Sequence, residues 1–255
     1  MINKLKKHQF LFSQLVKRDF TVKYKRTVLG LLWSVLNPLL QLIVMWLVFS
    51  NFFGANIEHY VIYLFAGNMI FSYFSEATST GMTSLLDNSG IFTKVNVPKY
   101  LFLFSKNIAS LISFGLTLII FILFCMFDGI TVTGNVIFVL YPILWLVIFN
   151  IGVGLILSAA FIFFRDLQYL WGIFTLLLNY LSAIFYTVST YEYRIQCLFF
   201  ANPIYTFIYY VRSVVIDGIV PSLWLHLLIA LYSMFAFGIG AWLYKKYNHE
   251  FLYYV

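Results

Sequence analysis

The sequence is short of charge. Asp, Glu, Lys and Arg make up 10% of its 255 residues, whereas soluble domains carry about 25%. Hydrophobic residues make up 62%, so a soluble fold of this chain would not have enough polar groups to cover its surface. We therefore expect an integral membrane protein whose main solvent is lipid.

The sequence also lacks the short motifs of common enzymes. No glycine is followed by lysine, which excludes a Walker A phosphate loop, and no close pair of Asp or Glu suits general acid–base chemistry. The two cysteines, Cys125 and Cys197, are far apart, and we expect them to be structural. The four histidines stand singly, at His8, His59, His226 and His249. These absences disfavour a self-contained enzyme, and we expect no metal or cofactor on this chain.

Six apolar segments are long enough to cross a bilayer, which takes about 20 residues in a helix. The expected spans are residues 30–53, 60–86, 104–127, 136–164, 169–190 and 223–244. No internal repeat or low-complexity linker divides the chain, so we expect one all-α transmembrane domain over residues 1–255. Segment 191–222 is interrupted by Gln196 and by Asn202-Pro203. We expect it to form short helices or a re-entrant hairpin on the outer face.

The cations are distributed unevenly along the chain. With the N-terminus inside, fourteen of the sixteen Lys and Arg lie in or beside cytoplasmic segments, and only Arg194 and Arg212 lie outside. This follows the positive-inside rule, so we expect both termini in the cytoplasm and the protein in the cell (cytoplasmic or inner) membrane. The same scatter disfavours a nucleic-acid-binding face.

Segment 1–29 holds eight of these cations. Apolar residues recur among them at roughly helical spacing, at Leu5, Phe12, Leu15, Val16 and Phe20. This pattern predicts an amphipathic helix in the membrane interface on an anionic leaflet, with a disordered basic tail as the alternative. The long polar lead and the missing small-residue cleavage site argue against a signal peptide.

Polar residues inside the first two spans are the candidate functional groups. In the first span, Asn37 and Gln41 are four residues apart and share a face, and Pro38 should kink the helix beside them. In the second, a helical stripe contains Asn68, Ser72, Ser75, Glu76 and Ser79. A charge such as that of Glu76 costs about 2.5–3.5 kcal/mol at membrane depth, so it should face water or the protein interior.

We therefore name Asn37, Gln41, Asn68, Ser72 and Glu76 as candidates for lining a conduit. Interhelical hydrogen bonding in a packed bundle is the alternative. The cytoplasmic segment 87–103 starts with a helix or turn signal and is interrupted at Pro98. It predicts a short surface helix that either connects two spans or docks a soluble partner.

Four motifs follow one another along nearly the whole chain. They are RDFTVKYKRTVLGLLWSVLNPLLQ at 18–41, SGIFTKVNVPKYLF at 89–102, FFRDL at 163–167 and NPIYTFIYYVR at 202–212. Together they resemble the type-two ABC transporter permeases that export polysaccharides, among them the O-antigen, teichoic acid and rhamnose-polysaccharide exporters. One position departs from the resemblance, because Ala183 stands where many of these permeases have proline, and this bears on the outer-gate geometry.

The resemblance implies a homodimer with six spans per subunit, paired with two copies of a separate ATP-binding subunit that uses ATP and Mg²⁺. It implies a coupling helix within 87–103, whose candidate ATPase-coupling residues are Ser89, Gly90, Phe92, Lys94, Val97 and Pro98. It also implies short outer gate helices between the last two spans. The outer-gate candidates are Asn202, Pro203, Tyr205 and Arg212.

The function expected from this resemblance is export of a lipid-linked polysaccharide or teichoic-acid-type polymer, with no catalysis by the chain itself. Lys23, Lys25 and Arg26 would attract the phosphate or pyrophosphate of the lipid-linked glycan where it enters, although orientation charge and contact with membrane lipids explain them as well. Alternatives are a related ABC permease for a drug or small lipid, a membrane acyl or glycosyl transferase, and a passive scaffold.

Overall fold

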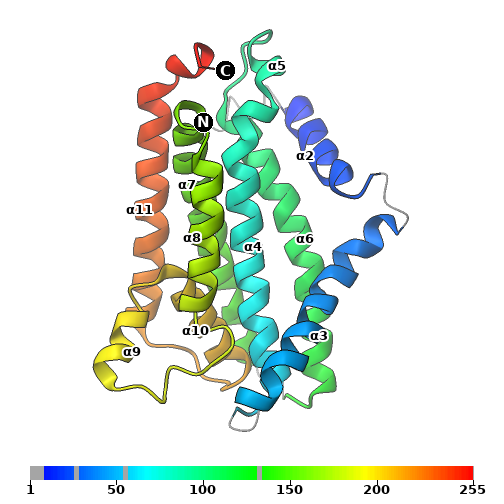
Figure 1. The fold of residues 1–255 in the computed structure, drawn as a ribbon, viewed down its shortest axis with the longest axis vertical. Coiled ribbons are helices and arrows are strands. Elements are labelled where there is room, and N and C mark those ends of the chain that lie inside the picture. Colours follow the sequence, from blue (N-terminus) through cyan, green and yellow to red (C-terminus); the bar gives the residue numbers. More distant parts are fainter. Residues whose placement is uncertain (1–8, 26–28, 54–56, 131–133, 255) are drawn as a thin grey trace.

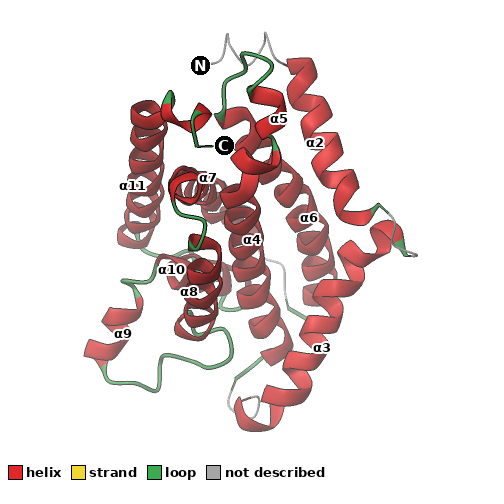
Figure 2. Ribbon diagram, turned by 45° about the horizontal axis from the view of Figure 1, so that its top comes forward, coloured by secondary structure: helices red, strands yellow, loops and turns green. Residues whose placement is uncertain are grey.

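The computed structural model of the chain describes residues 9–25, 29–53, 57–130 and 134–254, and within these ranges all regular structure is helical (Figures 1 and 2). The helical elements are, in chain order, α2 (Gln9–Tyr24), η1 (Gly30–Leu32), α3 (Trp33–Phe53), α4 (Tyr60–Asp87), α5 (Ser89–Phe92), α6 (Tyr100–Phe127), η3 (Gly134–Val139), α7 (Leu140–Phe163), α8 (Leu167–Leu181), α9 (Tyr193–Phe199), α10 (Pro203–Val215), α11 (Leu223–Tyr247) and η4 (Glu250–Leu252).

The long helices form a bundle around α4 (Figure 1). Helices α6 and α7 pack directly on α4, and α11 packs along α7. Helix α5 and the C-terminal segment lie at one end of the bundle, which we call the α5 end, and α9 and α10 lie toward the opposite, or α9, end (Figures 1 and 2). Helix α3 has fewer neighbours and lies obliquely against α4 and α6.

Four helices are long and apolar enough to cross a membrane. These are Trp33–Ser50, Tyr100–Phe127, Gly134–Phe163 and Leu223–Tyr247. They confirm the expected multi-pass character at the first, third, fourth and sixth predicted spans. Helix α4, which covers the second predicted span, has 28 residues but carries the polar stripe. Helix α8, in the fifth, has only 15 residues.

The fifth predicted span, 169–190, differs from the structure at its end. Helix α8 ends at Leu181, and the chain then turns through Ala183, whose φ of +49° is left-handed. The apolar run SAIFY continues the sequence pattern of a span, but its backbone leaves the helix. The following segment, 191–222, contains two short helices, α9 and α10, which is one of the two forms expected for it.

Helix α2 packs on α6 through the apolar stripe expected of an amphipathic helix. Leu15 is buried, and Phe12, Val16 and Phe20 are half-buried, whereas Leu5 lies outside the described residues. Polar contacts hold the same interface, because Ser105 Oγ donates to Asp19 Oδ2 at 2.8 Å. The apolar side of α2 therefore faces the protein.

A hydrophobic cluster at the α5 end joins α2, α4, α5, α6, α7, α11 and η4. Its buried members are Leu15, Leu85, Phe92, Val97, Leu101, Phe102, Leu103, Leu155, Ala159, Ile162, Tyr244 and Phe251. A larger cluster fills the rest of the bundle between α4, α6, α7, α10 and α11. The loop after α4 is thus attached to most of the bundle through buried side chains.

Helices α7 and α11 approach closely at two glycines. A Cβ on Gly152 would lie 2.4 Å from the backbone nitrogen of Phe237, and one on Gly240 would lie 2.7 Å from the carbonyl oxygen of Gly152. Small residues allow such close backbone approach in membrane bundles. The Ser158 and Tyr244 hydroxyls, 2.7 Å apart, join the same two helices near the α5 end. The pair is therefore fixed along much of its length.

We predict that Gly152→Ala lowers the thermal stability of the protein, because the added methyl group would force the backbones of α7 and α11 apart. Overpacking of this kind costs about 1–3 kcal/mol. Gly238→Ala is the matched control on α11, since a Cβ there meets nothing within 4 Å. The unfolding temperatures of both variants can be measured in detergent by circular dichroism. Equal unfolding temperatures for Gly152→Ala and Gly238→Ala would contradict this prediction.

Candidate functional site

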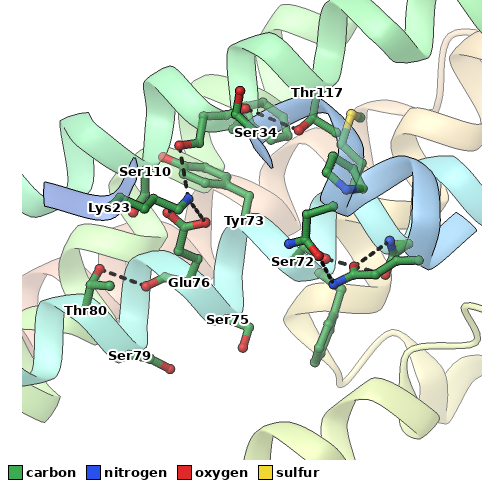
Figure 3. Close-up of a pocket in the computed structure, with 18 of the residues that line it drawn as sticks. Lys23, Ser34, Ser72, Tyr73, Ser75, Glu76, Ser79, Thr80, Ser110 and Thr117 are labelled. Atoms are coloured by element: carbon green, nitrogen blue, oxygen red, sulfur yellow. Dashed lines mark hydrogen bonds and ion pairs between the residues drawn. The ribbon is translucent and has the colours of Figure 1, made fainter. Parts of the chain in front are cut away.

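Helices α3, α4 and α6 border an open cavity of about 880 Å³ (Figure 3). Lys23 of α2 and Asn179 of α8 also line it. Its wall is rich in hydroxyl and amide groups although the bundle is apolar. The polar lining residues are Lys23, Ser34, Asn37, Gln41, Asn68, Ser72, Ser75, Glu76, Ser79, Thr80, Ser110, Ser113, Thr117 and Asn179. All five conduit candidates named from the sequence border this one cavity.

An ion pair lies in the wall of the cavity. Lys23 Nζ is 2.8 Å from both carboxylate oxygens of Glu76 and donates to Ser113 Oγ at 3.2 Å (Figure 3). The side chains are 39% and 33% exposed, so both still reach the open space. The cation of α2 thus compensates the only carboxylate among the lining residues, and this explains how Glu76 is tolerated in the middle of α4.

A series of three weak hydrogen bonds runs along the same wall, and one of them crosses from α3 to α4. Gln41 Nε2 donates to Asn37 Oδ1, Asn68 Nδ2 donates to Gln41 Oε1, and Ser72 Oγ donates to Asn68 Oδ1, each at 3.4 Å. We call this series the amide relay. Bonds of this length are weak. Replacing one of them with a bond to another hydroxyl or to water therefore costs little free energy.

Local sequence explains how these groups reach the cavity. Helix α3 continues through Pro38, which also lines the cavity, so the proline lies within the helix and does not end it. Along α4 the polar residues recur every three or four positions and therefore share a face. The hydroxyl of Thr80 donates to its own helix, at the Glu76 carbonyl, 2.8 Å away.

Sequence reasoning missed the contribution of α6. Ser110, Ser113 and Thr117 line the cavity and are three and four residues apart, which is the same helical signal that identified the α4 stripe. Ser34 of α3 and Asn179 of α8 were also missed, although Ser34 lies three residues before Asn37 and Asn179 lies four residues after Thr175, which is the same helical spacing. Of the three cations proposed for substrate entrance, Lys23 lines the cavity, Lys25 is exposed in the turn after α2, and Arg26 lies outside the described residues.

A second polar arrangement surrounds Arg212 on α10. The guanidinium is buried and donates to three backbone carbonyls: Tyr63 at 2.9 and 3.2 Å, Ala183 at 2.8 Å and Ile184 at 2.9 Å. It also stacks on the Tyr63 ring, 3.3 Å from its centroid. In the described part of the chain it has no carboxylate partner. Arg212 therefore joins α10 to the first turn of α4 and to the turn after α8.

The other outer-gate candidates lie at the same junction. Asn202 caps α10 by accepting from Ile204 N at 3.0 Å, and its amide donates to Ser182 Oγ at 3.0 Å. Pro203 occupies the first turn of α10, where its missing N–H is harmless, and Tyr205 is buried. The left-handed φ of Ala183 is inaccessible to proline, whose ring holds φ near −65°. The departure from the family pattern at this position thus coincides with a backbone that proline could not adopt.

The six coupling candidates do not share one surface. Phe92 and Val97 are each 5% exposed and belong to the hydrophobic cluster at the α5 end, whereas Gly90 and Lys94 are exposed. Ser89 and Pro98 are half-buried. Thr93, Val95 and Asn96 are exposed beside Lys94 and were missed. A partner docking here would therefore meet Gly90 and residues 93–96, while Phe92 and Val97 anchor the loop to the bundle.

No cluster of three or more His, Cys, Asp or Glu side chains that could hold a metal ion occurs in the ranges that the structure describes. Cys125 is buried and Cys197 is exposed, and both are free thiols. The chemistry that the cavity offers is hydrogen bonding to polar groups and one exchangeable ion pair.

Comparison with known proteins gives one family. The profile of the ABC-2 type transporter family matches residues 10–216. The chain is 29% identical over 192 residues to the O-antigen export system permease protein of Myxococcus xanthus, covering 74% of this chain and 73% of that protein. It is 27% identical over 214 residues to an O-antigen export system permease protein of Klebsiella pneumoniae, covering 82% of each. A capsule polysaccharide export inner-membrane protein of Neisseria meningitidis is 21% identical over 189 residues, 73% of this chain and 71% of that protein.

We predict that the α3–α4–α6 cavity contains water. In a Cys197→Ser background, a cysteine at Ser75 should react readily with a charged methanethiosulfonate reagent in permeabilised membranes, because the thiolate that reacts requires hydration. The control is a cysteine at Ile119, which is exposed on α6 but does not line the cavity. We expect the Ile119 position to react at least about tenfold more slowly. Equal rates would show that the cavity is not hydrated.

We predict that Arg212→Met lowers stability strongly, by about 3 kcal/mol or more, because it leaves three carbonyls in the protein interior without their donor. Arg212→Lys should be intermediate, since one ammonium cannot match the planar guanidinium. Arg194→Met removes the same charge from an exposed position on α9 and should be nearly neutral. Thermal unfolding in detergent measures all three, and equal effects of Arg212→Met and Arg194→Met would contradict this role.

Proposed function

Because the chain belongs to the ABC-2 type transporter family, we propose that it is the membrane permease subunit of an ATP-driven exporter of a lipid-linked polysaccharide or teichoic-acid-type polymer. The names of its relatives, which are O-antigen and capsule polysaccharide export proteins, support a glycan cargo. The observation that carries the proposal is the large open cavity that gathers hydroxyl, amide and charged side chains from an otherwise apolar bundle.

The proposed topology has six crossings, with α4 and α8 added to the four long apolar helices. The α5 end would face the cytoplasm of the cell membrane, and both chain termini would lie on that side. The segments around Lys94, Lys99, Arg165 and Lys245–Lys246 carry cations toward this end, which supports that orientation. Helices α9 and α10 would then form the outer gate, held in place by Arg212.

The energy for transport would come from a separate subunit, since the chain has no Walker A loop. In this proposal two permease copies pair with two ATP-binding subunits, which hold ATP and Mg²⁺. The exposed surface of Gly90 and residues 93–96 would receive the movement of the ATPase, and buried Phe92 and Val97 would pass it to the bundle. Helix α8 buries only Thr175 within one subunit, which supports a second copy against its exposed apolar face.

The cavity would form part of the substrate path at the subunit interface. The phosphate or pyrophosphate linkage of the substrate carries negative charge, so it would compete with Glu76 for Lys23, with Lys25 and Arg26 nearer the cytoplasm. Sugar hydroxyls would then exchange with the amide relay and with the hydroxyl groups of α4 and α6. Alternating closure driven by the ATPase would move the polymer outward.

The competing functions are less well supported. No histidine or cysteine lines the cavity, and its one carboxylate, Glu76, is paired with Lys23, which disfavours the activated nucleophile and general base that an acyl or glycosyl transferase needs. A passive scaffold does not account for a cavity of this size and polarity. A drug or small-lipid permease would use the same architecture, and the names of the relatives favour glycan export over it.

Reconstitution in liposomes with the ATP-binding subunit tests the proposal. We expect a glycan linked to lipid through pyrophosphate to stimulate ATP hydrolysis and to cross the membrane only with ATP. Lys94→Glu should lower both activities by about tenfold, equivalent to roughly 1.4 kcal/mol of lost interface energy. Lys246→Glu, an equal charge reversal on exposed α11, is the control. If the glycan neither stimulates hydrolysis nor crosses, the proposed function is wrong.

A further inference from the structure

A second cavity lies at the α5 end, as a groove of about 680 Å³ bounded by α6, α7, α11 and the loop before α6. It shares no lining residue with the α3–α4–α6 cavity. Its lining combines Lys99 and Lys245 with apolar side chains, among them Phe104, Leu155 and Phe237. This groove is therefore not part of the proposed substrate path, and its role needs a separate explanation.

Lys99 is the unusual member of the groove. Its side chain is 7% exposed, and its ammonium donates to the Asn248 carbonyl and lies 5.7 and 5.4 Å from the ring centroids of Phe92 and Phe251. Within the described chain it forms no ion pair. Burial lowers the pKa of Lys99, because water no longer stabilises the charged form. An ammonium has three N–H donors, and the Asn248 carbonyl accepts from one of them. An anion in the groove would supply further hydrogen-bond acceptors and a compensating negative charge.

The remaining lining separates into a charged rim and an apolar floor. Lys245 is exposed on the rim, and none of the lining residues is Asp or Glu. The floor is formed by Phe104 of α6, Leu155 of α7, and Phe237 and Ala241 of α11. A ligand that matches both parts carries a negative head and a hydrocarbon body.

We propose that this groove binds one anionic phospholipid of the membrane, with its phosphate between Lys99 and Lys245 and an acyl chain on the apolar floor. Basic pockets between transmembrane helices on the cytoplasmic side bind anionic headgroups in this way. The proposal rests on the membrane orientation given above and does not depend on which polymer is exported.

The position of the groove gives such a lipid a role. Lys99 joins the loop that carries Phe92 to the carbonyl of Asn248 just beyond α11, and the C-terminal segment lies beside α5 (Figure 1). A phosphate bound at Lys99 keeps this cation charged and holds the loop against α11. The lipid would therefore set how firmly the coupling loop is attached to the α7–α11 pair.

The binding test uses the purified full-length chain in detergent, titrated with phosphatidylglycerol or phosphatidylcholine and analysed by native mass spectrometry. We expect the wild-type protein to prefer phosphatidylglycerol. Lys245→Met should weaken that binding by about tenfold, the effect of one lost charge-assisted contact. Lys246→Met is the matched control, because Lys246 does not line the groove and its ammonium lies 5.0 and 5.1 Å from the Trp242 and Tyr247 rings.

A second variant tests the floor without changing any charge. Ala241 is exposed in the groove, so Ala241→Trp should fill the acyl-chain site and weaken phosphatidylglycerol binding, whereas inorganic phosphate alone should not displace the lipid. Equal affinity for the two lipids, equal losses in Lys245→Met and Lys246→Met, unaltered binding by Ala241→Trp, or displacement by phosphate each overturns the proposal. Neither the ATPase nor the glycan is present, so the result is separate from the test of export.

Discussion

A charged side chain in a lipid-solvated bundle has to find its partner inside the protein, and this one constraint governs how the helices are held together. Glu76 is paired with Lys23, which comes from the N-terminal helix. Arg212 is paired with three backbone carbonyls, which come from the start of α4 and the turn after α8. In both cases the partner belongs to another element, because the helix that carries the charge has already used its own backbone groups.

The Arg212–carbonyl contacts and the Lys23–Glu76 ion pair differ in how strongly they fix the helices that they join. Arg212 is buried and donates to three carbonyls at once. Separating α10 from α4 would therefore leave a buried cation without its acceptors and buried carbonyls without their donor, which costs free energy. The Lys23–Glu76 pair is about one-third exposed at the edge of a cavity, where water or an incoming anion can replace either partner. The junction around Arg212 is therefore rigid, and the Lys23–Glu76 pair beside the cavity is exchangeable.

Much of this arrangement could be predicted from the sequence, for reasons that differ between elements. Apolar length alone identified α3, α6, α7 and α11, and the spacing of Asn68, Ser72 and Glu76 placed them on one face of α4. The end of α8 could not be predicted from the sequence. Ala183 adopts a left-handed backbone conformation, which glycine usually marks in a sequence, and here the residue is alanine. Lys23 and Glu76 are 53 positions apart in the sequence. Local sequence patterns relate only neighbouring residues, so they could not predict this ion pair. The burial of Phe92 and Val97 could not be predicted, because a loop sequence does not show which of its apolar residues face inward.

The weak hydrogen bonds of the amide relay determine the energy barriers that a polymer would meet when it moves along this wall. A wall of long hydrogen bonds between neutral groups has many states of nearly equal energy, so a chain of sugar hydroxyls sliding past it would meet low, closely spaced barriers and no deep trap. Such a wall cannot recognise one repeat unit strongly, since strong recognition and easy sliding require opposite energy profiles. Selection among polymers would then depend on charged contacts such as those of Lys23 and Glu76 in the same cavity, and the amide relay would accept any polymer that these contacts admit.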